Sequence, residues 1–303
     1  VRGTVLQRVG SFQVRLSAAS KETSCFFISK ILRLTESLFY FNLWCAAMLK
    51  DLHIHIERGP YTLEWIEKFI SKAHQMELDE ICLLEHSIRF KDFHPTFKEA
   101  RNYNNYQRRW FDEKTKTAHM LDEFKELASK VRLKNYPVKV SFGLEVCWFE
   151  QHSNLIGELV SDGFFDYLLG SVHWVDNWTF NQRKYQWLGR DTDEIYTRYF
   201  ELENSLVQSD IFDIIAHPDL ITCHNIYPSF DLCDEYDGLC KNIKKHNMCL
   251  EMNTSKGLRV NKEFLDFAVK NSVKFSTGSD AHRVEDVGRK IKEADMLISR
   301  SLR

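Results

Sequence analysis

The sequence predicts an α/β protein in which residues 48–303 form a distorted, TIM-like (β/α)7 barrel of parallel strands. Short apolar segments typical of buried strands alternate with longer segments whose apolar residues recur at helical spacing. In addition, His, Asp or Glu follows almost every strand segment, and side chains at the ends of parallel strands meet at one end of a barrel. An open doubly wound sheet is the alternative, but it gathers its site mainly at one switch point.

Seven strand segments can be recognised in order along the chain. Each is a short run rich in β-branched and other apolar residues, and Pro137 precedes the third. The predicted strands cover residues 48–54, 80–84, 138–146, 165–172, 211–216, 248–252 and 273–277. Because a helical segment separates each strand from the next, the strands are expected to be parallel.

The helices are predicted from the spacing of apolar residues and from their caps. In the first helix Ile66, Phe69, Ile70 and Ala73 recur at helical spacing, and Asp191 is a typical N-terminal cap of the fourth. The predicted helices cover residues 61–76, 112–133, 153–161, 191 onward, 231–247, 261–271 and 285 onward. Residues 88–110 and 174–190 are expected to form long loops on the side where the strands end, which is where substrate loops belong.

Residues 1–47 differ in composition from the rest of the chain. They carry six basic and two acidic side chains, whereas the rest carries 35 basic and 41 acidic ones. The apolar stretch 38–48 is too short to span a bilayer, and no Ala-x-Ala cleavage site separates it from the first strand. Because Met48 opens a natural start, we expect residues 1–47 to be an upstream extension, non-native or disordered, rather than a folded domain.

Charge and cysteine content limit the possible partners and compartment. An acidic body has no general field to attract nucleic acid or an anionic membrane. The eight cysteines form no CxxC pair, and several lie inside apolar runs, which indicates buried thiols in a reducing compartment. We therefore expect a cytoplasmic protein that acts on a small molecule, with neither nucleic acid nor membrane as a partner.

Eight candidate metal ligands follow the predicted strands. They are His53, His55, His86, Glu145, His173, His217, Asp280 and His282. Residues two apart in an extended segment point to the same face, so His53 can act with His55, and Asp280 with His282. Imidazole and carboxylate suit Zn²⁺, Mn²⁺ or Fe²⁺, and one ion takes three or four protein ligands. Two or three ions are therefore expected, and Glu145 could bridge two of them.

The ordered motifs DxHxH, EHS, GLE, GSxH, AHPD, NTS and GSDAH resemble those of the polymerase and histidinol phosphatase (PHP) family of metallophosphoesterases. The resemblance spans residues 49–303, and the stretches 250–259 and 278–288 look most like the histidinol-phosphatase branch. It implies a distorted (β/α)7 barrel. It also implies three groups of metal ligands, namely His53, His55, Glu145 and Asp280; Glu145, His173 and His217; and His86 with His282.

The sequence departs from the family pattern at the third group. The family usually has a further His several residues after HxH, and Tyr61 stands about where that His is expected. Glu57 could substitute as an oxygen ligand; otherwise the third site is weak, empty or built differently.

The resemblance implies hydrolysis of a phosphomonoester, and L-histidinol phosphate is the expected substrate. Nucleotides, nucleic-acid ends and phosphotyrosine stay open as alternatives, as does a non-catalytic metal-stabilised module, because pocket loops choose the leaving group. We expect Glu145, His217, Asp280 and Arg58 to be catalytic. Substrate contacts are expected from Arg58, Arg183, Lys184 and His94. Asp219 could orient His217, serve as a general acid or simply cap a turn.

Overall fold

The computed structural model describes residues 8–9, 12–13, 48–255 and 261–302. The chain divides after Met48 into two units. In the first unit, the described residues form two short antiparallel strands, β1 (Arg8–Val9) and β2 (Phe12–Gln13). The prediction that residues 1–47 are an extension falls almost entirely outside the described residues and stays a prediction.

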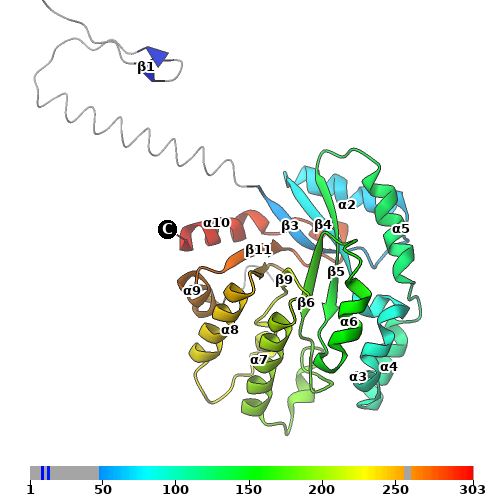
Figure 1. Ribbon diagram of the computed structural model, residues 1–303, viewed down its shortest axis with the longest axis vertical. Coiled ribbons are helices and arrows are strands. Elements are labelled where there is room, and N and C mark those ends of the chain that lie inside the picture. Colours follow the sequence, from blue (N-terminus) through cyan, green and yellow to red (C-terminus); the bar gives the residue numbers. More distant parts are fainter. Residues whose placement is uncertain (1–7, 10–11, 14–47, 256–260, 303) are drawn as a thin grey trace, which may run out of the picture. The chain divides into compact units, whose positions relative to one another are not determined.

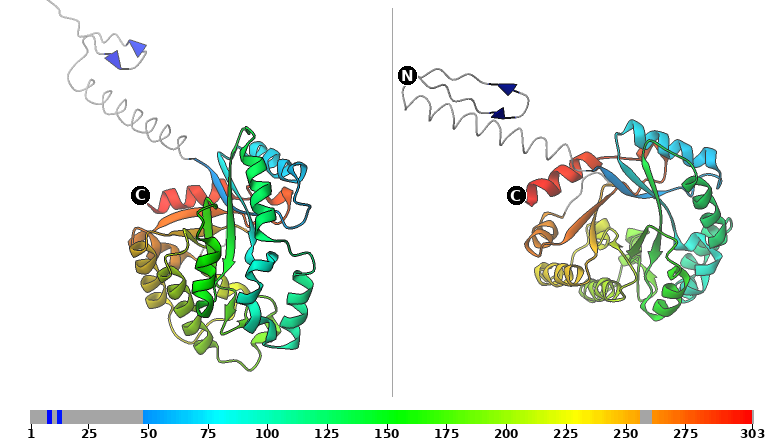
Figure 2. Two further views of the ribbon diagram at one scale, coloured as in Figure 1. Left: turned by 45° about the vertical axis from the view of Figure 1, so that its right-hand side comes forward. Right: turned by 45° about the horizontal axis from the view of Figure 1, so that its top comes forward.

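The second unit is built on a seven-stranded parallel sheet with the order β11-β10-β9-β6-β5-β4-β3. Its strands are β3 (Lys50–His55), β4 (Glu80–His86), β5 (Lys139–Cys147), β6 (Tyr167–Ser171), β9 (Ile214–Ile215), β10 (Cys249–Asn253) and β11 (Lys274–Gly278). At the open side of the sheet, Ile54 of β3 forms a parallel bridge with Ala281 in the segment that follows β11. The sheet is therefore a nearly closed (β/α)7 barrel, as the sequence predicts (Figure 2).

Helices surround the barrel, with at least one after each barrel strand (Figure 1). The main ones are α2 (Leu63–Gln75), α5 (Leu121–Arg132), α6 (Ser153–Val160), α7 (Thr192–Gln208), α8 (Cys233–Lys245), α9 (Lys262–Lys270) and α10 (Ile291–Ser301). The Asp191 side chain accepts hydrogen bonds from two amides in the first turn of α7, which confirms the predicted cap. None of the helices in the described part of the chain is long and apolar enough to cross a membrane.

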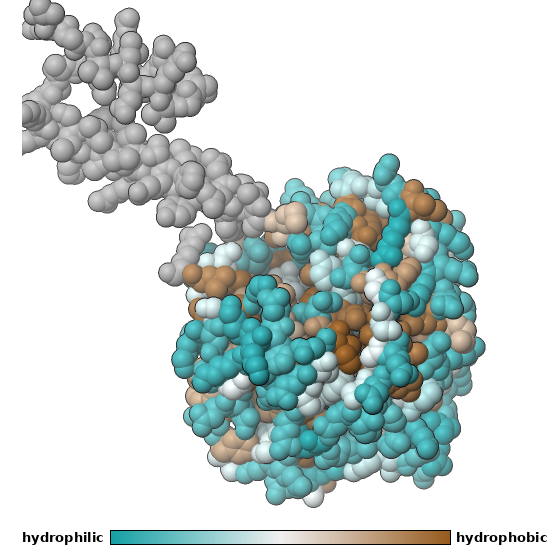
Figure 3. All heavy atoms as spheres, in the orientation of Figure 1, coloured by the Kyte–Doolittle hydropathy of each residue, from teal (hydrophilic) through white to brown (hydrophobic). Residues whose placement is uncertain are grey.

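Apolar side chains pack in two places. A large cluster fills the space between helices and sheet, and a small one of Leu52, Cys82, Leu84, Leu169, Ile214 and Ala216 fills the barrel interior. Alternation along a strand sends successive residues to these two places. The surface in Figure 3 is mostly hydrophilic, because each helix turns its apolar side to the sheet.

The prediction of a loop over residues 88–110 is wrong. This stretch contains 3₁₀ turns followed by α3 (Lys98–Asn102) and α4 (Asn105–Lys114). Helix α4 carries few apolar residues, so periodicity does not reveal it, and a buried Gln107 holds it through hydrogen bonds to the carbonyls of Ala100 and Asn177. The single helix predicted over residues 112–133 is also wrong, because α4 and α5 are separate.

Two other elements differ from prediction. The segment 174–190 contains a hairpin of β7 (Trp174–Val175) and β8 (Trp178–Thr179) and a 3₁₀ turn rather than only loop. Its tryptophans are buried, which indicates a packing role. Strand β9 covers two residues, shorter than the six predicted over 211–216.

Candidate metal centre

The eight candidate ligands all lie at or just beyond the carboxyl ends of the barrel strands. His55 and His86 are the last residues of β3 and β4. His53 lies near the end of β3, and Glu145 lies near the end of β5. The other four follow β6, β9 and β11 within a few residues: His173, His217, Asp280 and His282. Since parallel strands end together, residues far apart in the sequence come to one end of the barrel.

Strand register brings the two paired motifs side by side. The amide of His55 donates to the carbonyl of Ala281 at 2.8 Å, and the amide of Ala281 donates to the carbonyl of His53 at 3.3 Å. Asp280 and His282 are the sequence neighbours of Ala281, and they therefore flank the two histidines of β3. Asp280 has a φ of 49°, a left-handed conformation that few residues other than glycine adopt.

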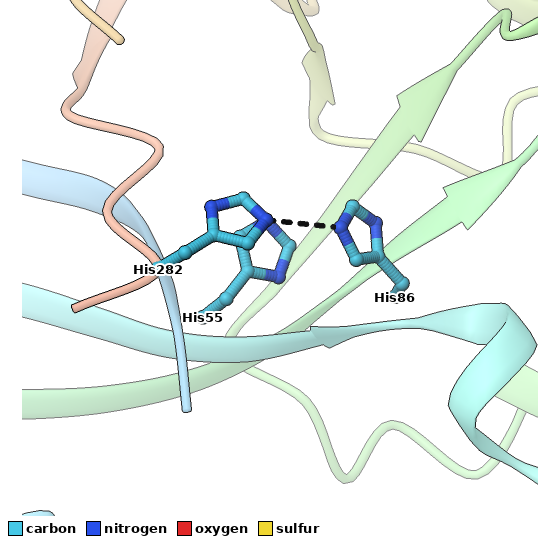
Figure 4. A group of neighbouring side chains, drawn as sticks. All are labelled: His55, His86 and His282. Atoms are coloured by element: carbon cyan, nitrogen blue, oxygen red, sulfur yellow. Dashed lines mark hydrogen bonds between the residues drawn. The ribbon is translucent and has the colours of Figure 1, made fainter. Parts of the chain in front are cut away.

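The ligand atoms form three groups in which all members lie within 4.8 Å of one another. The groups are His53, His55 and Asp280; His55, His86 and His282; and Glu145, His173 and His217. Figure 4 shows the second group, in which rings from β3, from β4 and from the segment after β11 turn toward one another. The Nε2 atoms of His86 and His282 are 3.4 Å apart there.

Glu145 lies at the centre of the whole arrangement. Its Oε1 is 3.1 Å from Nε2 of His217 and 3.6 Å from Nε2 of His173. Its Oε2 is 2.7 Å from Nδ1 of His86, and 3.4 and 3.3 Å from Nε2 of His53 and His55. One buried carboxylate thus faces five imidazoles, which is the position expected of a bridging ligand.

The polar atoms of this centre fit a cation. The Nε2 atoms of His53 and His55 face each other at 3.0 Å. The same two Nε2 atoms lie 3.3–3.7 Å from Oε2 of Glu145 and Oδ1 of Asp280. Two imidazole nitrogens and two carboxylate oxygens that converge in this way are a donor set that suits a divalent metal ion.

Electrostatic interactions within the centre keep its acids ionised. Burial alone would raise the pKa of Glu145, but the charge of His86 and hydrogen bonds from neighbouring histidines hold it well below its usual value. Burial likewise opposes ionisation of Asp280, yet His53 and His55 lower its pKa. Ionised carboxylates are what a divalent cation requires as ligands.

The histidines split into two kinds. Burial lowers the pKa of His173 to about 3 and, with the charge of His55, that of His282 to about 4. Burial also acts to lower the pKa of His217, but Glu145 raises it to about 9. The first two are therefore neutral imidazoles at neutral pH, the form that binds metal.

Glu57 lies beside the third group, where the sequence lacks the expected histidine. Its Oε1 is 3.6 Å from Nε2 of His282. Burial acts to raise the pKa of Glu57, but the charges of His86 and of its neighbours lower it, and the net pKa lies below the usual value. Tyr61 instead stacks on His119, with ring centroids 4.2 Å apart. Glu57 thus lies beside His282 but is not among the atoms of this group that lie within 4.8 Å of one another, and Tyr61 packs on His119 instead.

A pocket of about 590 Å³ opens beside the centre. Besides several of the candidate ligands, it is lined by Asn181, Asp219, Thr222, Asn225, Tyr227, Asn253 and Asn261. In the part of the chain that the structure describes, no Lys or Arg lines it. Beyond the metal centre its wall is therefore mostly amides and hydroxyls, with Leu220, Cys223 and one carboxylate, that of Asp219.

The four residues expected to contact substrate are not among those that line the pocket. Arg58, Arg183 and Lys184 are exposed. His94 lies 3.2 Å from the Ile88 carbonyl through its Nε2 and packs edge-on against Phe111. This environment indicates a structural role for His94.

Sequence reasoning missed the carboxylates that hold the ligands in place. Asp51 accepts hydrogen bonds from the amides of Ser279 and Gly288, at 2.8 and 2.9 Å, and so fixes the segment that carries Asp280. Glu251 lies 2.7 Å from Nδ1 of His53. An acid within an otherwise apolar strand was the signal available for Glu251.

Comparisons with known proteins agree with this geometry. The model of the PHP domain family matches residues 51–255. A protein of Deinococcus radiodurans described as a probable histidinol-phosphatase is 25% identical over 169 residues, which are 51% of this chain and 62% of that protein. The chain thus matches less than two thirds of the length of this relative.

A solved structure has the same fold. The crystal structure of histidinol phosphate phosphatase from Lactococcus lactis, complexed with zinc, L-histidinol and phosphate, matches with a TM-score of 0.59 and 18% identity. The match covers 84% of this chain and 94% of that one. At this identity the likeness is evidence for the fold alone.

Proposed function

Since the chain belongs to the PHP domain family, we propose that it is a metal-dependent phosphomonoesterase whose substrate is L-histidinol phosphate. The observation that carries the proposal is the convergence of six imidazoles and two carboxylates around Glu145, beside a pocket of about 590 Å³. Such a centre suits an anionic ester, because divalent ions offset the charge on phosphoryl oxygens.

Two or three divalent ions of zinc, manganese or iron are proposed as the cofactor. Four residues would hold the first ion: His53, His55, Glu145 and Asp280. Glu145, His173 and His217 would hold the second, and His86, His282 and Glu57 the third. Bound there, the ions would lower the pKa of coordinated water toward about 7 and offset phosphate charge.

The protein side chains have separate tasks in this reaction. Glu145 lies between the imidazoles of the first two proposed metal sites. The ends of the barrel strands hold the metal ligands in a fixed geometry, so little reorganisation is needed as charge develops in the reaction. The pocket wall around Asn181, Asn225 and Asn261 offers amides for hydrogen bonds to the organic part of the ester. These positions support the catalytic roles expected of Glu145, His217 and Asp280.

The pocket wall favours a substrate with a cationic organic part. Among the described residues that line the pocket, Asp219 is the one acidic side chain that is not a candidate metal ligand. Histidinol carries an amine, whose positive charge Asp219 can pair with, whereas the nucleoside of a nucleotide is neutral and a phosphotyrosine side chain within a peptide carries no amine. This supports the choice of L-histidinol phosphate over nucleotides, nucleic-acid ends and phosphotyrosine peptides.

The proposal is tested with the full chain loaded with Zn²⁺ or Mn²⁺ and offered L-histidinol phosphate, nucleoside monophosphates, phosphotyrosine and short oligonucleotides. Release of phosphate is expected from L-histidinol phosphate with the highest kcat/KM, and chelation should abolish it. Preference for another phosphoester would replace the substrate but keep the chemistry. No turnover of any phosphoester would refute the proposed activity.

A further inference from the structure

We infer that Glu251 is a positioning residue that uses one carboxylate to hold ligands of two metal sites at once. The inference rests on the proposed metal centre and deepens it. Glu251 belongs to none of the four groups of candidate ligand atoms found among the described residues. It lies on β10, where Cys249, Glu251 and Asn253 share the face that looks into the barrel, since Cys249 packs on the interior cluster.

The first oxygen of the carboxylate fixes the tautomer of His53. Oε1 of Glu251 lies 2.7 Å from Nδ1 of His53, and both side chains are buried. An ionised carboxylate only accepts hydrogen bonds, so the imidazole proton must lie on Nδ1. Nε2 of His53 then carries the lone pair, and it faces Nε2 of His55 at 3.0 Å and the Glu145 carboxylate at 3.4 Å.

The second oxygen reaches ligands of both sites. Oε2 of Glu251 accepts a hydrogen bond from the backbone N–H of His217 at 2.7 Å. His217 has a φ of 33°, a conformation that is unfavourable for a side chain with a Cβ and needs support from its surroundings. Oε2 also accepts Nδ2 of Asn253 at 3.2 Å, and the same amide group lies 3.4 Å from Oδ2 of Asp280.

The barrel leaves space for this carboxylate at one glycine. A Cβ on Gly278 would lie 2.2 Å from Oε1 of Glu251 and 2.6 Å from Cβ of His53. Atoms cannot approach so closely, so β11 admits the Glu251–His53 pair only because residue 278 has no side chain. The close fit on three strands is evidence that the contact is built into the fold.

Only an ionised carboxylate satisfies both sides. Glutamine at this position has one acceptor oxygen and one donor group. If its oxygen faces His217, its NH₂ group faces Nδ1 of His53 and favours the tautomer that carries the proton on Nε2. Nε2 then has no lone pair with which to bind a metal ion. If its oxygen faces His53, its NH₂ opposes the amide of His217. Either orientation weakens one of the two sites.

The test compares the full chain with its Glu251→Gln variant in metal affinity and in kcat/KM. Zn²⁺ and Co²⁺ affinities are measured by chelator competition, with the Co²⁺ absorption spectrum as a record of ligand geometry. Loss of a partner of this kind costs about 10–100-fold in metal affinity. We expect that loss, a changed Co²⁺ spectrum, and recovery of kcat/KM when metal is added in excess.

Glu80→Gln is the matched control, because Glu80 is also a buried carboxylate but pairs with Lys50 and Lys139 at the opposite end of the strands. The control should lose stability and keep its metal affinity. Should Glu251→Gln fail to fold, the inference is tested in the wild-type chain loaded with Zn²⁺, where side-chain ¹⁵N spectra must show His53 protonated on Nδ1.

The outcomes separate the two levels of the argument. If the wild-type chain binds metal and Glu251→Gln binds it equally well, Glu251 is not a positioning residue, although the proposed function stands. Protonation of His53 on Nε2 would also overturn the inference. If the wild-type chain binds no divalent ion, the proposed function fails and the inference with it.

Discussion

Replacing Glu145 by glutamine is the sharpest perturbation of the proposed centre. The substitution keeps the size of the side chain and removes its charge. Both Glu145 oxygens face ring nitrogens, with distances from 2.7 Å to His86 up to 3.6 Å to His173. The amide can neither bridge two ions nor accept from rings on both sides, so both the first and the second sites should weaken.

The size of the effect follows from these distances. An ion held between the carboxylate and the facing rings lies within about 4 Å of the carboxylate charge. At an effective dielectric constant of about 20, unit charges at that distance interact by about 4 kcal/mol. Loss of this interaction corresponds to about 10³-fold in affinity for each ion. The rate should fall on the order of 10²–10⁴-fold at fixed metal concentration.

The assay is metal content after dialysis against a defined free Zn²⁺ concentration, together with turnover of L-histidinol phosphate. Glu80→Gln again serves as the control for removal of a buried carboxylate. We expect near-stoichiometric metal in the control and a deficit of at least one ion in Glu145→Gln. Equal metal content and equal turnover in wild type and Glu145→Gln would refute the assignment of Glu145 as the bridge.

Four further predictions address single features. Removal of metal by a chelator should lower the melting temperature, because a ligand at 100 times its Kd stabilises a fold by about 2.7 kcal/mol, and an unchanged melting curve would contradict metal binding. Glu57→Gln should lower the metal content by one ion and spare the other sites; unchanged content removes Glu57 from the third group. Asp219→Asn should raise KM for L-histidinol phosphate at least tenfold and leave KM for p-nitrophenyl phosphate unchanged, since only the former carries an amine; equal changes for both would exclude charge recognition. Burial raises the pKa of Glu203 from 4.5 to about 8, so its stability contribution is complete below about pH 4.5 and is lost as pH rises through 8. Urea unfolding of the metal-free chain should therefore show that the free energy of unfolding of Glu203→Gln rises relative to that of wild type by up to about 1.4 kcal/mol per pH unit between pH 5 and 8. A difference that stays constant with pH would show that Glu203 is already ionised.

The barrel and its ligand residues were predictable because each depends on local sequence. A buried strand and the residue that follows it lie within a few positions, as for His86 after β4. Once parallel strands are predicted, their ends must meet, and no knowledge of long-range contacts is needed to bring the ligands together. The departure at Tyr61 was also visible locally, and the structure adds that Glu57 lies 3.6 Å from His282.

The supporting residues depend on contacts between distant segments, which one sequence does not reveal. Glu251 and His53 are 198 positions apart, and their contact needs both the strand order and the space at Gly278. Helix α4 escaped prediction because it has few apolar residues at helical spacing, and the hydrogen bonds of its buried Gln107 to the carbonyls of Ala100 and Asn177 are tertiary contacts. Arg58, expected to contact substrate, is exposed and does not line the pocket, because the position of a side chain after a strand depends on loop geometry. Its contact with substrate stays a prediction.

Anomalous X-ray scattering from crystals grown with Zn²⁺ or Mn²⁺ tests the central claim most directly. The account predicts at least two strong peaks on either side of Glu145, about 3.5–4 Å apart, with one among His53, His55 and Asp280 and another against His173 and His217. Peaks located only elsewhere in the molecule, or no peak at the barrel rim at saturating metal, would contradict it.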